Sequence, residues 1–104
     1  MTFPFKSKDD PKSLPKQISA YLSQYVQNRL DDFDQIKSSK FDLLFIRDYC
    51  HKVIGSARSY NLFQLEEITI ELQELARRED KEQIKTLLED YGQYLNELAK
   101  KHLA

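Results

Sequence analysis

A histidine and a glycine in the stretch DYCHKVIGSARSYN, residues 48–61, carry the main chemical signal of this sequence. His51 is followed four residues later by Gly55, one of only two glycines in the 104-residue chain. The surrounding residues predict a helix, where glycine costs about 1 kcal/mol relative to alanine, so a retained glycine indicates packing or close approach. An exposed imidazole titrates near neutral pH and can act as a nucleophile, and a neighbouring glycine leaves room for the reacting group.

The helical wheel places His51 outside the apolar arc of its helix. At about 100° per residue, five apolar positions form one core-facing arc: Leu43, Ile46, Cys50, Val53 and Ala57. The residues within roughly 40° of His51 are Leu44, Arg47, Gly55 and Arg58. Asp48 and Ile54 lie roughly 60° to either side. His51 therefore belongs to a polar stripe that borders the core. Arg58 can supply positive charge to an anion at the ring.

Other catalytic chemistry has little support in this sequence. The second histidine, His102, lies near the far end of the chain and is interpreted as a surface residue, and Cys50 is the only cysteine. No pair of ligands with metal-binding spacing surrounds His51, and phosphate-binding loops, dinucleotide fingerprints and nucleophile triads are absent from the sequence. We expect no metal or cofactor on this chain, no autonomous enzyme activity, and a buried, unreactive thiol at Cys50.

The charge balance and hydropathy exclude two large classes of partner. Sixteen basic against seventeen acidic residues give a net charge of -1, so there is no broad cationic field for nucleic acid or anionic lipid. No apolar run approaches the ~20 residues of a membrane span. The first residues, MTFPFKSKDD, lack the apolar core and cleavage site of a secretory signal. We therefore expect a cytoplasmic protein that binds neither nucleic acid nor membrane.

The composition predicts an all-helical fold. The chain is 40% hydrophobic and 32% charged, and its three prolines all lie in the first fifteen residues. This pattern indicates an irregular N-terminal lead followed by helices. We predict a flexible or loosely docked segment over residues 1–12 and a single helical domain over residues 13–104.

Apolar residues at three-and-four spacing predict four amphipathic helices. The first spans about residues 14–36, and the sequence leaves open whether it breaks near Pro15 or is continuous. The second ends near Asn61, the third spans 62–78, and the fourth follows Asp80. Outside the second helix, the apolar stripes are Ile18, Tyr21, Leu22, Tyr25, Val26, Leu30 and Phe33 in the first, Leu62, Leu65, Ile68, Leu72 and Leu75 in the third, and Ile84, Leu87, Leu88, Tyr91, Leu95 and Leu98 in the fourth. Ser39 and Asp42 resemble a capping box that opens the second helix, and Asp80 with Gln83 does the same for the fourth. Asn61 suits the left-handed conformation that closes a helix. Such helices bury their apolar stripes best as an antiparallel, up-down-up-down four-helix bundle.

The stretch HKVIGSARSYN resembles the motif of the histidine-containing phosphotransfer (HPt) domain family. That motif has a lysine three residues after its histidine, a glycine at the fourth position, often a serine next, and a second glycine about ten residues on. Here His51, Gly55 and Ser56 match, and Asn61 stands where the second glycine is usual. Ile54 occupies the lysine position, which is the main departure, and the nearby Lys52 points roughly 100° away from His51 on the helical wheel. The resemblance in helix order extends from about residue 14 to residue 100.

The resemblance implies a carrier of phosphoryl groups in a two-component phosphorelay. His51 would accept the group from an aspartyl phosphate of a receiver domain and pass it to another receiver's aspartate. The implied partners are response-regulator receiver domains or a hybrid histidine kinase, with Mg²⁺ on the receiver. Arg58 and Lys52 would stabilise the phosphoryl oxygens, and Gly55 with Ser56 would permit close approach. The implied docking surface near His51 consists of four residues: Leu44, Arg47, Asp48 and Ile54. The resemblance also implies a monomeric protein.

Two other interpretations remain open from the residues alone. The first is a non-catalytic HPt-like adaptor, which docks receivers or kinases without carrying phosphate, and in which Ile54 marks the lost chemistry. The second is a helical interaction module, possible as a homodimer, with Ile54, Ile70, Tyr91 and Tyr94 in the subunit interface.

Overall fold

The computed structural model describes residues 9–40 and 42–103, and over that range the chain is all-helical without a β-strand. The elements in chain order are a short 3-10 helix and five α-helices: η1 (Pro11–Ser13), α1 (Lys16–Ser19), α2 (Leu22–Ser38), α3 (Leu43–Ser59), α4 (Phe63–Arg77) and α5 (Lys81–His102). Among the described residues, none of these helices has both the length and the apolar character needed to cross a bilayer.

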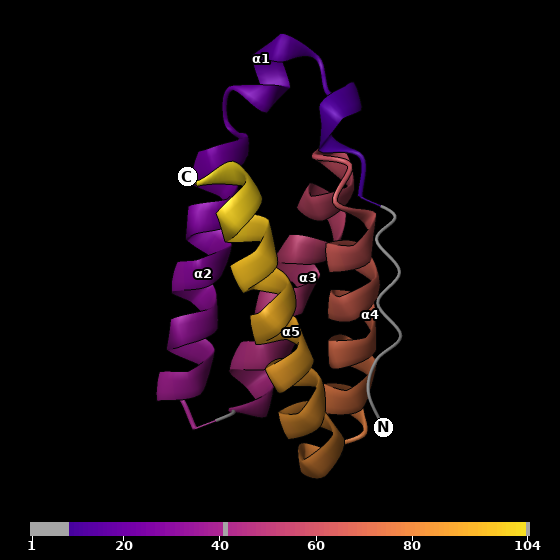
Figure 1. The fold of residues 1–104 in the computed structure, drawn as a ribbon. Coiled ribbons are helices and arrows are strands. Elements are labelled where there is room, and N and C mark those ends of the chain that lie inside the picture. The colour runs from indigo at the N-terminus through magenta and orange to yellow at the C-terminus, as the bar shows by residue number, and fades with distance from the viewer. Residues whose placement is uncertain (1–8, 41, 104) are drawn as a thin grey trace.

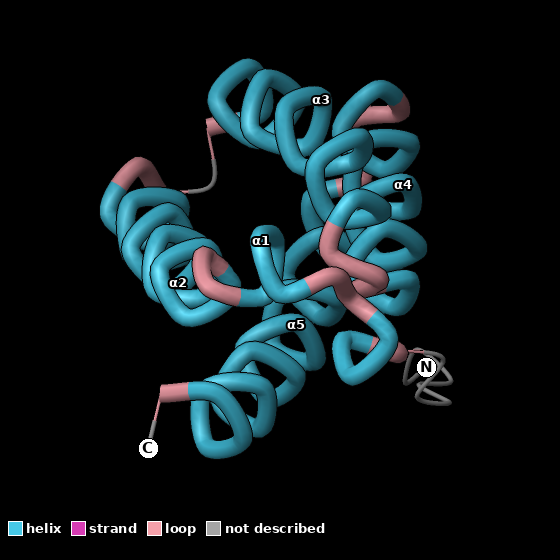
Figure 2. The backbone as a smooth tube through the Cα atoms, turned by 90° about the horizontal axis from the view of Figure 1, so that it is seen from above, coloured by secondary structure: helices cyan, strands magenta, loops and turns pink. Residues whose placement is uncertain are grey.

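The four long helices run side by side, and consecutive ones point in opposite directions (Figure 1). The most extensive contact is between α3 and α4, while α5 packs on both α2 and α4. In contrast, α2 meets α3 only lightly. The view down the helices shows α2, α3, α4 and α5 around a common interior, with α1 lying over one end (Figure 2).

The buried residues follow the apolar stripes expected from the sequence. All of the predicted core positions of α4 and α5 are buried: Leu62, Leu65, Ile68, Leu72, Leu75, Ile84, Leu87, Leu88, Tyr91, Leu95 and Leu98. Four of the five predicted core residues of α3 are buried as well, while Leu43 is half-buried and packs against them. Removing each such side chain from water contributes roughly 1.5–3 kcal/mol, so these stripes supply the main driving force for folding.

The predicted first helix is interrupted rather than continuous. A turn at Ala20 and Tyr21 separates α1 from α2. There the amide of Tyr21 donates to the carbonyl oxygen of Ile18, three residues earlier, at 3.0 Å, whereas an α-helix joins residues four apart. Ile18 and Tyr21 are 37% and 65% exposed, whereas Leu22 is buried. The tighter turn changes the helix phase, so α1 leaves the core face that the sequence pattern assigned to it. At the other end α2 continues to Ser38, so part of the predicted connector is helical.

Asp42, and not Ser39, caps the start of α3. The Asp42 carboxylate accepts hydrogen bonds from the amides of Leu44 at 3.0 Å and Phe45 at 3.1 Å. The Ser39 hydroxyl donates to the carbonyl of Ile36 at 2.7 Å, so this residue closes α2. The predicted capping box is present in part, because the Ser39 hydroxyl also accepts from the amide of Asp42 at 3.3 Å. The reciprocal bond is missing: the Ser39 amide donates to the carbonyl of Gln35 at 2.9 Å, and the Asp42 carboxylate caps α3 instead.

The predicted helix end at Asn61 and the cap at Asp80 are confirmed. Asn61 has a φ of 55°, the left-handed conformation expected after α3. The Asp80 carboxylate accepts from the amide of Gln83 at 3.2 Å and so begins α5. These two local signals set the lengths of the helices that pack beside each other.

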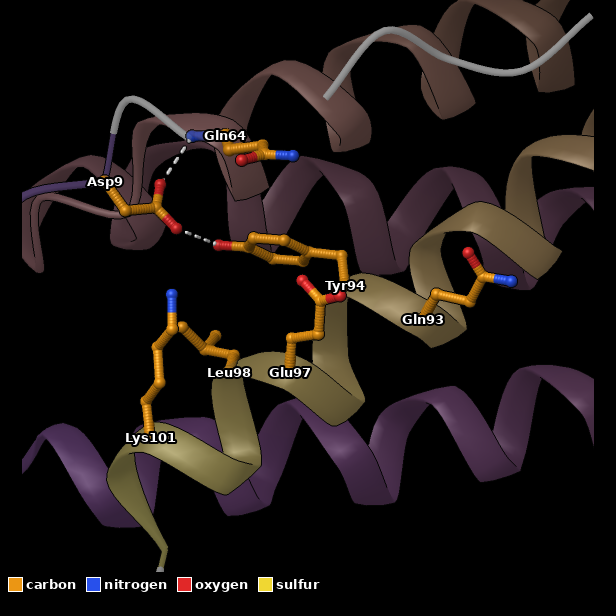
Figure 3. Close-up of a pocket in the computed structure, with 7 residues that line it drawn as sticks. All are labelled: Asp9, Gln64, Gln93, Tyr94, Glu97, Leu98 and Lys101. Carbon is orange, nitrogen blue, oxygen red and sulfur yellow. Dashed lines mark hydrogen bonds between the residues drawn. The ribbon is translucent and has the colours of Figure 1, made fainter. Parts of the chain in front are cut away.

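The first turn of α4 is capped from a distant part of the chain. Its N-cap residue, Leu62, has no polar side chain, and the Asp9 carboxylate takes that role by accepting from the amide of Gln64 at 2.9 Å. The same carboxylate accepts from the hydroxyl of Tyr94 on α5 at 2.6 Å, as Figure 3 shows. Asp9 therefore ties the N-terminal lead to both α4 and α5.

Residues 9–12 belong to the segment that was predicted to be flexible or loosely docked, and they are anchored to the helices. The amide of Asp10 also donates to the carbonyl of Asn61 at 2.9 Å, and η1 begins at Pro11. Residues 9–12 are thus part of the folded unit. Residues 1–8, the rest of that predicted segment, lie outside the described residues.

Candidate functional site

His51 lies in the middle of α3, and its side chain is exposed. The opposite face of the helix is held in the core by residues such as Cys50 and Val53, which are 0% and 1% exposed. Because packing on that face fixes the rotation of α3, the imidazole is presented to solvent on a rigid element. The prediction that His51 lies outside the core is confirmed.

Gly55, one turn after His51, has no packing role among the described residues. A β-carbon added there would meet no heavy atom within 4 Å beyond the neighbouring backbone of its own helix. The residue is exposed and its φ is not positive, so neither close packing nor a left-handed backbone requires glycine. The open space is on the same face as the imidazole.

Arg58 lies on the His51 face but is paired with another helix. Its Nε lies 3.5 Å from an Oε atom of Glu66 on α4. The Arg58 side chain is 73% exposed, while Glu66 is 17% exposed and thus the more fixed partner. Seven residues separate Arg58 from His51, or about 10 Å along the helix axis.

Lys52 and Asp48 both line a groove of about 410 Å³ between α2 and α3, together with Arg29 and Asp32 of α2. His51 does not line this groove. Around the helix axis Lys52 lies roughly 100° from His51 and Asp48 roughly 60°. The phosphate-stabilising role of Lys52 and the docking role of Asp48 stay predictions.

Ile54 and Ser56 are built into helix packing. Ile54, at the position of the family lysine, is half-buried and packs against the core. The Ser56 hydroxyl lies 2.7 Å from the Tyr25 hydroxyl of α2, and it also lies 3.2 Å from the carbonyl oxygen of Val53. Ser56 thereby links α3 to α2, which explains a serine at this position by contacts inside the chain.

A polar and aromatic network around Tyr25 was not predicted. The ring of Tyr25 stacks on Tyr60 with centroids 4.3 Å apart, and the Arg29 guanidinium lies 4.5 Å from the Tyr25 centroid. Arg29 also pairs with Asp32 at 2.9 Å. Burial lowers the pKa of Arg29, but interactions with Tyr25 and Asp32 outweigh burial and raise it. The sequence showed Tyr25 only as one member of an apolar stripe.

Both tyrosines that the dimer interpretation assigned to a subunit interface are core residues. Tyr91 is 0% exposed and Tyr94 is 7% exposed. The hydroxyls of Tyr49 and Tyr91 form a buried hydrogen bond. Burial raises the pKa of Tyr91 and that of Tyr94 above the usual tyrosine range. The assignment of Tyr91 and Tyr94 was wrong because both rings are buried in the core between the helices. Ile70, which was assigned to the same interface, is 49% exposed.

The remaining titratable candidates offer no second reactive centre. Burial raises the pKa of the Cys50 thiol to about 12, in agreement with the predicted unreactive cysteine. His102 is half-buried rather than a surface residue, and burial lowers its pKa. Within residues 9–40 and 42–103, no group of three or more potential ligands is arranged to hold a metal ion.

The arrangement therefore consists of one exposed imidazole, open space one turn further on, and arginines on the same helix face. An exposed imidazole of this kind can act as a nucleophile toward a group brought to it from outside the chain. Comparison of the chain with known proteins gave no match to any family model, curated protein or solved structure.

Proposed function

We propose that this protein is a cytoplasmic histidine phosphotransfer protein that relays a phosphoryl group between receiver-domain aspartates through His51. The observation that carries the proposal is the pairing of an exposed imidazole with Gly55, whose missing side chain has no use in packing among the described residues. A mid-helix glycine costs about 1 kcal/mol, so open space at this position is best explained by what approaches from outside.

The arrangement of the helices supports the same proposal. We take α2, α3, α4 and α5 as an antiparallel four-helix bundle of the HPt type, with the motif in the middle of its second long helix. Asn61, with a φ of 55°, is compatible with the family's second glycine, since both residues accept a left-handed backbone.

The chemical step is an in-line transfer of the phosphoryl group to His51, and the chain returns to its original state only when the group passes to a second receiver. The lone pair of a neutral ring nitrogen of His51 forms a bond to phosphorus as the O–P bond of the aspartyl phosphate breaks. The aspartate carboxylate leaves with the bonding electrons, and the other ring nitrogen keeps its proton during the step. The receiver contributes its acidic pocket and Mg²⁺, which act by positioning and charge neutralisation. The reverse sequence would deliver the group to a second receiver.

A second candidate function is a non-catalytic adaptor that docks receivers or kinases without carrying phosphate. It is favoured by Ile54, which packs against the core at the position where the family has a lysine. On this alternative the exposed apolar residues Leu44 and Phe45, 65% and 37% exposed, would serve binding alone.

A transfer assay separates the two functions. Receiver domains loaded with Mg²⁺ are charged with a small phosphodonor and mixed with the wild-type protein or with His51→Gln. We expect acid-labile label on the wild type and none on the variant, with a known HPt domain as the positive control. Absence of label on the wild type while the control accepts it would reject the relay function and leave the adaptor.

A further inference from the structure

The face of α3 around His51 lacks the lysine of the family motif, so a different cation would have to neutralise the phosphoryl group. A phosphoryl group carries close to two negative charges at neutral pH and has three acceptor oxygens. Three basic residues of α3 are candidates to contact these oxygens: Arg47, Lys52 and Arg58.

Two of these candidates are less well placed. Lys52 points roughly 100° away from His51 around the helix, and it lines the groove between α2 and α3, which His51 does not line. Arg58 is two helical turns away from His51 and pairs at 3.5 Å with Glu66, whose side chain is only 17% exposed. Moving Arg58 to the imidazole would leave that half-buried carboxylate unpaired, which adds an energetic cost to its use.

Arg47 is free of both restrictions. Its side chain is exposed, and within the described ranges that side chain makes no hydrogen bond and no ion pair. It precedes His51 by four residues, the spacing at which side chains on a helix surface are neighbours, with β-carbons about 5–6 Å apart. Side chains on a helix lean toward its N-terminus, so the ring of His51 leans toward the turn that carries Arg47.

We propose that Arg47 is the residue that contacts the phosphoryl oxygens on His51 and takes the place of the missing lysine. This inference rests on the proposed phosphotransfer function. Arg47 forms no covalent bond during the step, and its planar guanidinium donates two parallel hydrogen bonds to the transferred group. Ile54 is then free to pack against the core without loss of the charge that the chemistry needs.

The test uses the full-length protein phosphorylated chemically with phosphoramidate, so that it does not depend on a receiver. The wild type is compared with Arg47→Gln, Arg58→Gln and Lys52→Gln, and His51→Gln identifies the signal of the phosphohistidine at residue 51. The readout is the pH midpoint of the ³¹P chemical shift, which a nearby cation lowers by stabilising the dianion. Circular dichroism checks that each variant is folded.

We expect Arg47→Gln to raise this midpoint by roughly 0.3–0.7 pH units, while Lys52→Gln and Arg58→Gln change it by about 0.1 or less. With an active receiver, the same variant should shift the transfer equilibrium away from His51 by about three- to tenfold. The double variant Arg47→Gln with Ile54→Lys should recover most of both effects, because a lysine can extend from a half-buried position to the surface.

An unchanged midpoint in Arg47→Gln, or a larger change in Arg58→Gln, would overturn the assignment of Arg47. Failure of every receiver to transfer would instead contradict the proposed function. The chemically phosphorylated variants would still decide which cation faces the phosphoryl group.

Discussion

The two glycines of the chain both lie inside long helices, yet they have opposite surroundings. A β-carbon at Gly92 of α5 would lie 3.0 Å and 3.2 Å from two ring carbons of Phe33 on α2. At Gly55 of α3 an added β-carbon would meet nothing within 4 Å outside its own helix backbone. A side chain at Gly92 would thus press on the ring of Phe33 at the contact between α2 and α5. Gly55 has no such neighbour among the described residues, and the proposed phosphotransfer function would give it a different use, as room for what approaches α3 from outside.

The same contrast divides the molecule into two regions. The core region contains Gly92, the buried tyrosines and the Asp9 cap, and changes there should alter stability alone. The His51 face contains Gly55 and Arg47, and changes there should alter phosphoryl transfer with little loss of stability. The predictions below test this division, in order of decreasing effect.

Alkaline pH should unfold the protein through its buried phenols. Burial is the main cause that raises the pKa of Tyr49, and likewise those of Tyr91 and Tyr94, in the folded state. Their stabilising effect is complete below pH ~10, the unfolded value, and is lost as the pH rises above it, because the unfolded state ionises first. Each phenol should cost about 1.4 kcal/mol at pH 11, or about 4 kcal/mol together. Urea unfolding between pH 7 and pH 11 measures this; a flat profile would contradict their burial.

Gly92→Leu should destabilise the protein by about 1–3 kcal/mol, because the new side chain must displace the ring of Phe33. The matched variant Gly55→Leu places the same side chain in open space and should leave stability unchanged or raise it by up to about 1 kcal/mol. Urea denaturation of both variants provides the comparison. Equal losses at the two positions would remove the distinction between the two glycines.

Asp9→Ala should cost about 1–2 kcal/mol, because it removes the carboxylate that accepts from the amide of Gln64 and from the hydroxyl of buried Tyr94. The control is Asp10→Ala, since among the described residues the Asp10 side chain accepts a hydrogen bond from the exposed Ser13 hydroxyl alone, at 2.6 Å. This variant should cost less than about 0.5 kcal/mol. Thermal unfolding followed by circular dichroism measures both. If Asp10→Ala lost as much stability as Asp9→Ala, the cap on α4 would not explain the effect of Asp9→Ala.

Gly55→Ala should have the smallest effect on stability and the most informative one on function. The free energy of unfolding should rise by about 0.5–1 kcal/mol, because alanine favours the helix and meets no neighbour. Phosphoryl transfer should slow at the same time, since the methyl group lies where the partner approaches. Quenched time courses of phosphoryl transfer measure the rate, and urea unfolding of the same preparation measures the free energy of unfolding. A variant that is more stable and transfers at the wild-type rate would show that Gly55 is not needed for close approach of the partner.

Local signals in the sequence were sufficient for much of the fold. The apolar stripes of α3, α4 and α5, the Asp80 cap and the left-handed Asn61 depend on residues within a few positions of each other, and each was predicted. The break at Ala20 and Tyr21 was not, because nothing in the apolar spacing marks the change of helix phase. The exposure of His51 followed from the helical wheel, since burial of the opposite face determines the rotation of α3.

Residues far apart in the sequence decided the rest. Asp9 meets Gln64 and Tyr94 across 55 and 85 positions of the chain, a pairing that no local pattern contains. Likewise, the wheel showed that Lys52 lies away from His51, but only the packing of α2 against α3 placed it in a groove with Arg29. The sequence by itself determined the helices and which face of each is apolar, because these depend on the period of the helix. Only the tertiary structure decided which polar side chains find partners, because that depends on which helices become neighbours.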